Sequence, residues 1–295
     1  MISRRTFLKE TIAVAALSAT AENFMPLYAA SLAIPLGLQL YSVRDLLPKD
    51  YDGTLHKIAS LGYREVEAAG FYDHTAAQVK KSMQENGLRC VSAHYPFAKL
   101  ASSVDDIVQY AHELGLEYII CPSPGAQDSS RPSGAHKVLS LDDWRWNADQ
   151  FNQIGEKFKK AGLQFGYHNH DFEFHPENGV RPYDELLRLT DPSKVTMELD
   201  LGWVVVGGAN PIDYLKNHPA RFSMFHVKDF KPTTPGSSAP PAATELGRGT
   251  IDYKPIFASM SRAHVRHIFV EQEEYDMPVW DSLKIDADYI RGLKA

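Results

Sequence analysis

Cysteine is scarce in this chain, and long apolar runs are missing from most of it. The 295 residues include only Cys90 and Cys121, which are too few for a framework of disulfides. Each lies in a short apolar run typical of a buried strand, so we expect two free, buried thiols. Beyond the first thirty residues no apolar run reaches about 18 residues, so we expect no membrane-spanning helix in the mature chain.

An excess of positive charge is also absent. Lys and Arg total 31 while Asp and Glu total 37, which gives a net charge of −6. Nucleic-acid-binding proteins favour a basic surface, so this balance argues against a nucleic-acid partner. The 44% hydrophobic and 23% charged residues are ordinary for a globular protein, and they exclude disordered, collagen-like and coiled-coil chains.

The N-terminal segment has the pattern of an export signal. Ser3-Arg4-Arg5-Thr6-Phe7-Leu8-Lys9 precedes a moderately apolar run over residues 11–21, and together they closely resemble a twin-arginine signal. We therefore expect residues 1–33 to be a signal peptide with a lead-in, and the twin-arginine translocase to be a partner during export. The mature protein would then be periplasmic. The alternative is a basic amphipathic helix.

Eight short runs rich in β-branched and aromatic residues recur along residues 34–295 and are predicted to be strands. Their nearly continuous hydrophobicity is typical of parallel strands buried on both faces. They are Leu36–Val43, Arg64–Ala69, Arg89–His94, Tyr118–Cys121, Gln164–His170, Val195–Leu201, Phe222–Lys228 and His267–Gln272.

A helical pattern follows each of these strands. The predicted helices are Thr54–Leu61, Thr75–Asn86, Val104–Leu114, Asp142–Ala161, Pro182–Leu189, Pro211–Lys216, Tyr253–Arg262 and Ser282–Leu293. Eight strand–helix units predict a single-domain α/β fold over residues 34–295, the (β/α)8 TIM barrel. A doubly wound open sheet is the alternative, but no Gly-x-Gly-x-x-Gly motif follows the first strand.

Two long loops, 122–141 and 231–250, follow the fourth and seventh predicted strands. Both would lie at the C-terminal rim of the barrel, where the active sites of TIM barrels form. The second loop is either a lid or a tolerated insertion.

Titratable side chains gather at the ends of the last four predicted strands. They are His168 and His170, Glu198 and Asp200, His226 and Lys228, and Glu271 and Glu273. A barrel brings these strand ends to one mouth. Burying so many charges together is costly unless a cation or hydrogen bonds compensate.

Strand alternation selects candidate metal ligands, because side chains two residues apart share a face. One from each strand gives His168, Asp200, His226 and Glu271. Two imidazoles and two carboxylates suit one divalent ion such as Mn²⁺, Zn²⁺, Co²⁺ or Fe²⁺ better than Ca²⁺. Mn²⁺ is the ion we expect, and Mg²⁺ also stays open. The alternative is a hydrogen-bonded polar layer without metal.

The order of these motifs resembles the xylose-isomerase-like barrel superfamily, and within it the sugar phosphate isomerase/epimerase group. The resemblance extends over residues 35–293. The segments that carry it are Leu38–Arg44, Tyr167–His170, Glu198–Trp203, His226–Asp229, Glu245–Asp252 and Glu271.

The resemblance implies a metal-dependent enzyme that removes a proton next to the keto group of a sugar or keto-sugar glycoside, through an enediolate. Ketose epimerases of this group have a glutamate where His168 stands, and that glutamate shares proton transfer with a second one. A histidine that binds metal cannot also take a proton, so the departure favours the dehydratase or lyase side of the group. The base used by some lyases of this barrel matches His170.

These resemblances suggest a role for each side chain at the mouth. We expect His170 to be the base with Glu271 as second choice, and Lys228 to stabilise oxyanion charge. Glu198 is expected to pair with Lys228, and Asp229 to orient a metal ligand. The expected substrate contacts are His94, Glu67, Trp203 and Glu173.

Two outcomes can follow proton removal. Reprotonation gives an isomerase or epimerase, whereas loss of a neighbouring leaving group gives a lyase. Export favours the lyase, because phosphorylated sugars are largely cytoplasmic. Alternatives from other classes are a non-catalytic periplasmic sugar-binding barrel, a metal-dependent hydrolase and an apurinic-site endonuclease, which the acidic charge disfavours. A homo-oligomer is compatible with the sequence.

Overall fold

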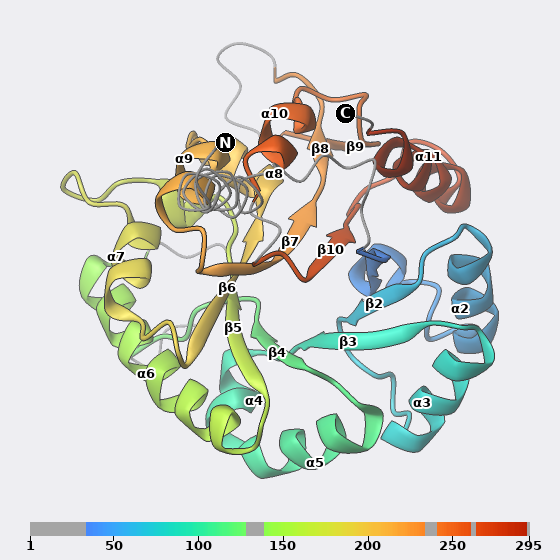
Figure 1. Ribbon diagram of the computed structural model, residues 1–295, viewed down its shortest axis with the longest axis horizontal. Coiled ribbons are helices and arrows are strands. Elements are labelled where there is room, and N and C mark those ends of the chain that lie inside the picture. The colour runs from blue at the N-terminus through green and yellow to red at the C-terminus, as the bar shows by residue number, and fades with distance from the viewer. Residues whose placement is uncertain (1–33, 128–138, 234–240, 261–263, 294–295) are drawn as a thin grey trace, which may run out of the picture.

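The computed structural model describes residues 34–127, 139–233, 241–260 and 264–293 (Figure 1). Within these residues eight parallel strands close into a barrel in the order β1-β10-β7-β6-β5-β4-β3-β2. The predicted single-domain TIM barrel is therefore confirmed. The expected signal, residues 1–33, lies outside the described residues.

All eight predicted barrel strands are present, some with shorter ends. They are β1 (Leu36–Gln39), β2 (Glu65–Ala68), β3 (Arg89–His94), β4 (Tyr118–Cys121), β5 (Gln164–His168), β6 (Val195–Asp200), β7 (Phe222–Val227) and β10 (His267–Val270). The first strand ends early because the Gln39 side chain accepts a hydrogen bond from the Tyr41 backbone N–H and starts the 3-10 turn η2 (Leu40–Val43). A second such turn, η3 (Phe172–Phe174), follows β5.

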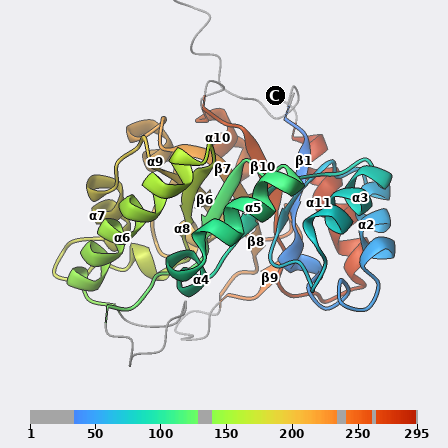
Figure 2. The same cartoon turned by 90° about the horizontal axis from the view of Figure 1, so that it is seen from below.

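The predicted helices form a layer around the strands (Figures 1 and 2). They are α2 (Tyr51–Ser60), α3 (Ala76–Glu85), α5 (Val104–Leu114), α6 (Leu141–Lys160), α7 (Pro182–Leu189), α9 (Pro211–Asn217), α10 (Tyr253–Ala258) and α11 (Val279–Gly292). Local signals start and end them: capping boxes open α3 and α6, and Gly115, with φ of 94°, ends α5.

Two short helices were not predicted, α4 (Phe97–Ser102) and α8 (Leu201–Val206). Helix α8 follows β6 without a loop, because the Asp200 side chain accepts a hydrogen bond from the Trp203 backbone N–H at 2.8 Å. Asp200 thus ends the strand and caps the helix, which holds its carboxylate at the barrel mouth.

An apolar layer inside the barrel separates two polar ends. It contains Val91, Ile120, Met224 and Phe269. On one side of this layer the buried Glu65 carboxylate contacts His267 Nδ1 at 2.7 Å. On the other side lie the C-terminal strand ends, which carry the side chains that the sequence singled out.

Both cysteines are free and buried, as predicted. Burial raises the pKa of the Cys90 and Cys121 thiols to about 12, so both stay protonated near neutral pH. Among the described helices, none combines the length and the hydrophobicity that crossing a membrane requires.

Asp229 anchors the chain that follows β7. This segment contains the antiparallel strands β8 (Asp229–Phe230) and β9 (Ala243–Thr244), seen in Figure 2. The Asp229 carboxylate accepts hydrogen bonds from the backbone N–H groups of Gly247, Gly249 and Ile251 at 3.0, 3.0 and 3.1 Å. The prediction that Asp229 orients a metal ligand is therefore wrong, because both of its oxygens hold this loop. Residues 234–240 of the loop 231–250, predicted to be a lid or a tolerated insertion, lie outside the described part of the chain.

The substitution Asp229→Asn is expected to lower the free energy of unfolding by about 3 kcal/mol, because one amide N–H₂ would face backbone donors in a buried position. Urea denaturation followed by circular dichroism measures this loss. Asp288→Asn, on the exposed side of α11, serves as the control and should leave the midpoint nearly unchanged. An equal midpoint in both variants would contradict the anchoring role.

Candidate functional site

The four predicted metal ligands converge at the C-terminal mouth of the barrel. One ligand atom from each of His168, Asp200, His226 and Glu271 lies within 4.8 Å of all the others; these four side chains are called the ligand cluster below. His168 Nε2 and His226 Nδ1 lie 4.0 and 3.9 Å from Asp200 Oδ2. His226 Nδ1 lies 2.9 Å from Glu271 Oε2.

The chemistry of the ligand cluster fits a divalent ion. All four side chains are buried, and imidazole with carboxylate is a donor set that Mn²⁺, Fe²⁺, Co²⁺ and Zn²⁺ accept. Burial and the charge of His226 hold the pKa of His168 well below its usual value. The ring of His168 is therefore neutral and keeps the lone pair that a metal ligand needs.

Lys228 borders the ligand cluster with its ammonium group. Its Nζ lies 3.0 Å from Asp200 Oδ2, 2.7 Å from Glu271 Oε2 and 2.7 Å from Glu273 Oε1. Burial opposes the charge, but these carboxylates outweigh it and raise the pKa of Lys228 well above its usual value. The predicted pairing of Lys228 with Glu198 is therefore wrong.

Glu198 faces the histidines instead. Its Oε2 lies 2.9 Å from His94 Nε2 and 3.1 Å from His168 Nδ1, while its buried Oε1 accepts no hydrogen bond from the described residues. His94, His168, Glu198 and His226 form a second group whose ligand atoms lie within 4.8 Å of one another.

Glu67 lies on β2, is fully buried, and has both oxygens occupied. Its Oε1 accepts from Gln39 Nε2 at 2.7 Å and contacts the Nε2 atoms of His226 and His94 at 2.7 and 2.9 Å. Its Oε2 accepts from Ser92 Oγ at 2.5 Å. Glu67 therefore faces protein groups in this structure, and its role as a substrate contact stays a prediction.

The predicted substrate contact His94 is partly buried and lies between two carboxylates. Burial disfavours its charge, but Glu67 and Glu198 outweigh that effect and raise the pKa of His94 to about 9. A charged His94 neutralises part of the negative field at the mouth.

The predicted base, His170, lies beside the ligand cluster. Its ring stacks on Phe172 at 5.5 Å between centroids and lies 6.1 Å from the ring of Trp203. The centroid of His168 lies 5.1 Å away. Trp203 also faces Lys228, whose Nζ lies 4.9 Å from the indole centroid. These rings form an aromatic wall next to the ligand cluster.

Glu173 contacts the aromatic wall through the backbone of His170. It is fully buried, and it accepts hydrogen bonds from Tyr167 Oη at 2.6 Å and from the His170 backbone N–H at 2.9 Å. Burial raises the pKa of Glu173 to about 8, although both hydrogen bonds act in the opposite direction. Glu173 thus holds the backbone of His170, and its role as a substrate contact stays a prediction.

Sequence reasoning missed Asn169, which joins β5 to β6. Its Oδ1 accepts from the Asp200 backbone N–H at 3.0 Å, and its Nδ2 donates to the Asp200 carbonyl at 3.2 Å. The sequence signal for this role was its position between two histidines. Because side chains alternate along a strand, Asn169 points away from the mouth and toward the neighbouring strand.

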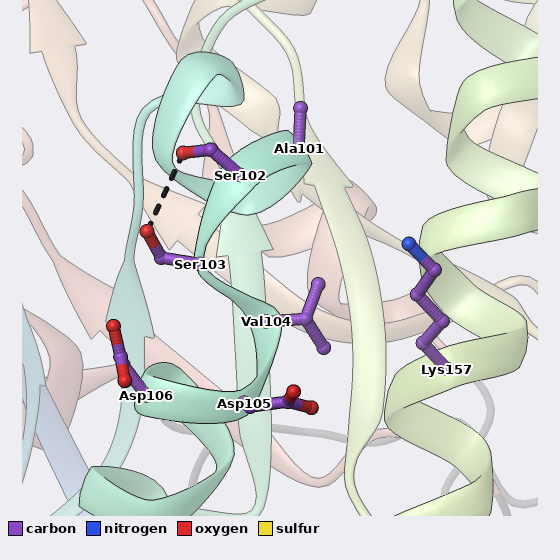
Figure 3. Close-up of a pocket in the computed structure, with 7 residues that line it drawn as sticks. All are labelled: Ala101, Ser102, Ser103, Val104, Asp105, Asp106 and Lys157. Atoms are coloured by element: carbon purple, nitrogen blue, oxygen red, sulfur yellow. Dashed lines mark hydrogen bonds between the residues drawn. The ribbon is translucent and has the colours of Figure 1, made fainter.

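The surface pocket in Figure 3 lies apart from these side chains. Residues 101–106 of α4 and α5 line it together with Lys157 of α6, and Ser102 Oγ lies 3.4 Å from Ser103 Oγ. No side chain from the C-terminal ends of the barrel strands lines it, so we place the functional site at the mouth.

Comparison with known proteins identifies the class. Residues 55–293 match the family described as xylose isomerase-like TIM barrel, and the chain belongs to this family. A curated relative, the inosose dehydratase of Geobacillus thermodenitrificans (strain NG80-2), is 24% identical over 251 residues, which cover 77% of this chain and 83% of the relative.

Solved structures agree with this fold. A sugar phosphate isomerase/epimerase from Parabacteroides distasonis ATCC 8503 is 26% identical with a TM-score of 0.70, and the match covers 87% of this chain and 97% of that one. A structure of the IOLI protein with a zinc atom has a TM-score of 0.68 at 13% identity, covering 88% and 98%. The inosose dehydratase and the sugar phosphate isomerase/epimerase support an enzyme of the sugar isomerase/epimerase kind, an isomerase or a carbon–oxygen lyase.

Adding Mn²⁺ or Zn²⁺ is expected to raise the midpoint of thermal unfolding, because an ion that binds only the folded state stabilises it. At an ion concentration about 100-fold above Kd the gain is about 2.7 kcal/mol. Asp200→Asn should weaken this response, and EDTA should reverse it. Ca²⁺ is the control, since it prefers six to eight oxygen ligands. An equal response to all three ions would contradict the imidazole–carboxylate site.

Proposed function

We propose that this protein is a divalent-metal-dependent carbohydrate isomerase/epimerase or lyase that removes a proton next to a keto group. The observation that carries the proposal is the ligand cluster at the barrel mouth, with His170 directly beside it. When bound by His168, Asp200, His226 and Glu271, a divalent ion would supply Lewis-acid stabilisation of the negative charge that develops on the substrate oxygen.

His170 is proposed to take the proton. Its backbone is tied to Glu173 and its ring packs on Phe172, so the imidazole is held in one orientation. The proton leaves the carbon next to the ketone, and the electron pair of the broken C–H bond forms the double bond of the enediolate. A positioned base of this kind contributes about 10²- to 10⁴-fold to the rate.

Lys228 and Trp203 are proposed to act on the rest of the substrate. The Lys228 ammonium, held by Asp200, Glu271 and Glu273, stabilises oxyanion charge, and the Trp203 indole stacks on a sugar ring.

We favour β-elimination over epimerisation. In that step the C–H electron pair forms a double bond between the α and β carbons as the bond from the β carbon to its oxygen breaks. That oxygen keeps the electrons of the broken bond, takes up a proton and leaves as water or as an alcohol. The histidine at the strand-five position supports this choice: Glu198 holds one nitrogen of His168, and a metal would take the other. The epimerase glutamate pair therefore has no counterpart here.

The proposal predicts that EDTA abolishes turnover of a 3-keto-glycoside and that Mn²⁺ restores it, since the developing charge then loses its main stabilisation. His170→Ala should lower kcat by about 10²- to 10⁴-fold without loss of metal binding. The exposed His175→Ala is the matched control and should keep full activity.

Mass spectrometry of the products separates the outcomes. Loss of one water identifies a dehydratase, loss of the aglycone a lyase, and an unchanged mass an isomerase or epimerase. Turnover that persists in chelator would contradict the proposal. Binding of the sugar without turnover would point to a sugar-binding barrel, and hydrolysis of an ester to a metal-dependent hydrolase.

We also propose that residues 1–33 direct export to the periplasm through the twin-arginine translocase, on the strength of the Arg4-Arg5 motif. Replacing both arginines by lysine is expected to retain the precursor in the cytoplasm of a bacterial host that has the translocase. Cell fractionation and immunoblotting measure the distribution. Glu22→Gln serves as the control, and unchanged export of the twin-lysine variant would refute the signal.

A further inference from the structure

We propose that Glu67 and Glu198 are positioning residues that decide which ring nitrogen each histidine of the ligand cluster presents, so that His168 offers Nε2 and His226 offers Nδ1. The inference rests on the divalent-ion site of the proposed function. It assigns a role to two buried carboxylates that belong neither to the ligand cluster nor to the aromatic wall.

The distances around His168 support the part of the proposal that concerns this histidine. Its Nδ1 lies 3.1 Å from Glu198 Oε2, while its Nε2 is the nitrogen that approaches Asp200 Oδ2, at 4.0 Å. A neutral imidazole has one N–H, and a carboxylate only accepts hydrogen bonds. The proton therefore lies on Nδ1, facing Glu198, and the lone pair on Nε2 faces the ligand cluster.

His226 has the opposite arrangement. Its Nε2 lies 2.7 Å from Glu67 Oε1, and its Nδ1 lies 2.9 Å from Glu271 Oε2 and 3.9 Å from Asp200 Oδ2. Both ring nitrogens of His226 therefore face carboxylates, which only accept hydrogen bonds. An ion held with Asp200 and Glu271 would take the place of the proton on Nδ1, while Glu67 would keep accepting the N–H of Nε2. The two histidines would bind one ion through different nitrogens.

The carboxylate of Glu67 is itself held in place by other side chains, so its contact with His226 is fixed by the fold. Gln39 on β1 donates to its Oε1 at 2.7 Å, and Ser92 on β3 donates to its Oε2 at 2.5 Å. The carboxylate cannot turn away from His226 without breaking both bonds. Strands β1 to β3, which supply none of the ligand cluster, thus act on it through Glu67, the partner of His226.

The ring nitrogens can be observed directly in the unaltered protein. Long-range ¹H–¹⁵N spectra of the Zn²⁺-loaded protein are expected to show the proton of His168 on Nδ1 and that of His226 on Nε2, with Zn²⁺ on the other nitrogen of each ring. The same protonated nitrogen on both rings would overturn the proposal. So would binding of two Zn²⁺ ions, because the second group of ligand atoms would then hold an ion in place of these hydrogen bonds.

Variants measure the effect on affinity. Glu67→Gln and Glu198→Gln place an amide N–H₂ where an imidazole N–H must be accepted, and each is expected to weaken Zn²⁺ binding by about 10- to 100-fold. Competition with a chromophoric chelator gives the Kd. The visible spectrum of the Co²⁺-loaded variants should also shift, because a ligand nitrogen is exchanged or lost.

Glu65→Gln is a closely matched control. Glu65 lies on the same strand as Glu67, is also buried, and contacts His267 Nδ1 at 2.7 Å beyond the apolar layer. It should cost comparable stability in urea denaturation yet leave the Zn²⁺ Kd unchanged. Equal Kd values for Glu65→Gln, Glu67→Gln and Glu198→Gln would overturn the positioning role alone. A wild-type protein that binds no Zn²⁺ would overturn the ion site itself, and with it both proposals.

Discussion

Excess negative charge in the barrel mouth is the constraint on which the site depends. Glu67, Glu198, Asp200 and Glu271 are buried there, and an uncompensated carboxylate in such a position costs several kcal/mol. Lys228 and the surrounding imidazoles offset part of this charge through short contacts. The same field favours a divalent cation between Asp200 and Glu271, so one electrostatic arrangement both stabilises the mouth and prepares it for metal.

The apolar layer makes the two ends of the barrel chemically different. On one side, Glu65 and His267 form a buried pair that Arg89 and its neighbours extend toward the surface. On the other side, carboxylates outnumber the permanent cations, and an aromatic wall borders them. Because that end holds the ligand cluster beside the aromatic wall, the candidate chemistry lies there, as it does in TIM barrels generally.

Much of the site could be predicted from strand alternation. The errors in the predicted side-chain partners have a common cause. Alternation assigns His168, Asp200, His226 and Glu271 to one face, and all four meet. It does not say which neighbour each side chain touches around the barrel. The register between β6 and β7 shifts between Met197 and Glu198, so Asp200 lies level with His226 and Lys228 reaches it, whereas Glu198 faces the histidines.

The sequence by itself determined the eight strand–helix units, the free thiols and the set of polar side chains at the mouth, because these depend on periodicity and short-range signals. Only the tertiary structure decided the partners of those side chains. Glu67 and His226 are 159 residues apart in the chain and meet at 2.7 Å. That contact requires the barrel to close in one register, which no local pattern encodes.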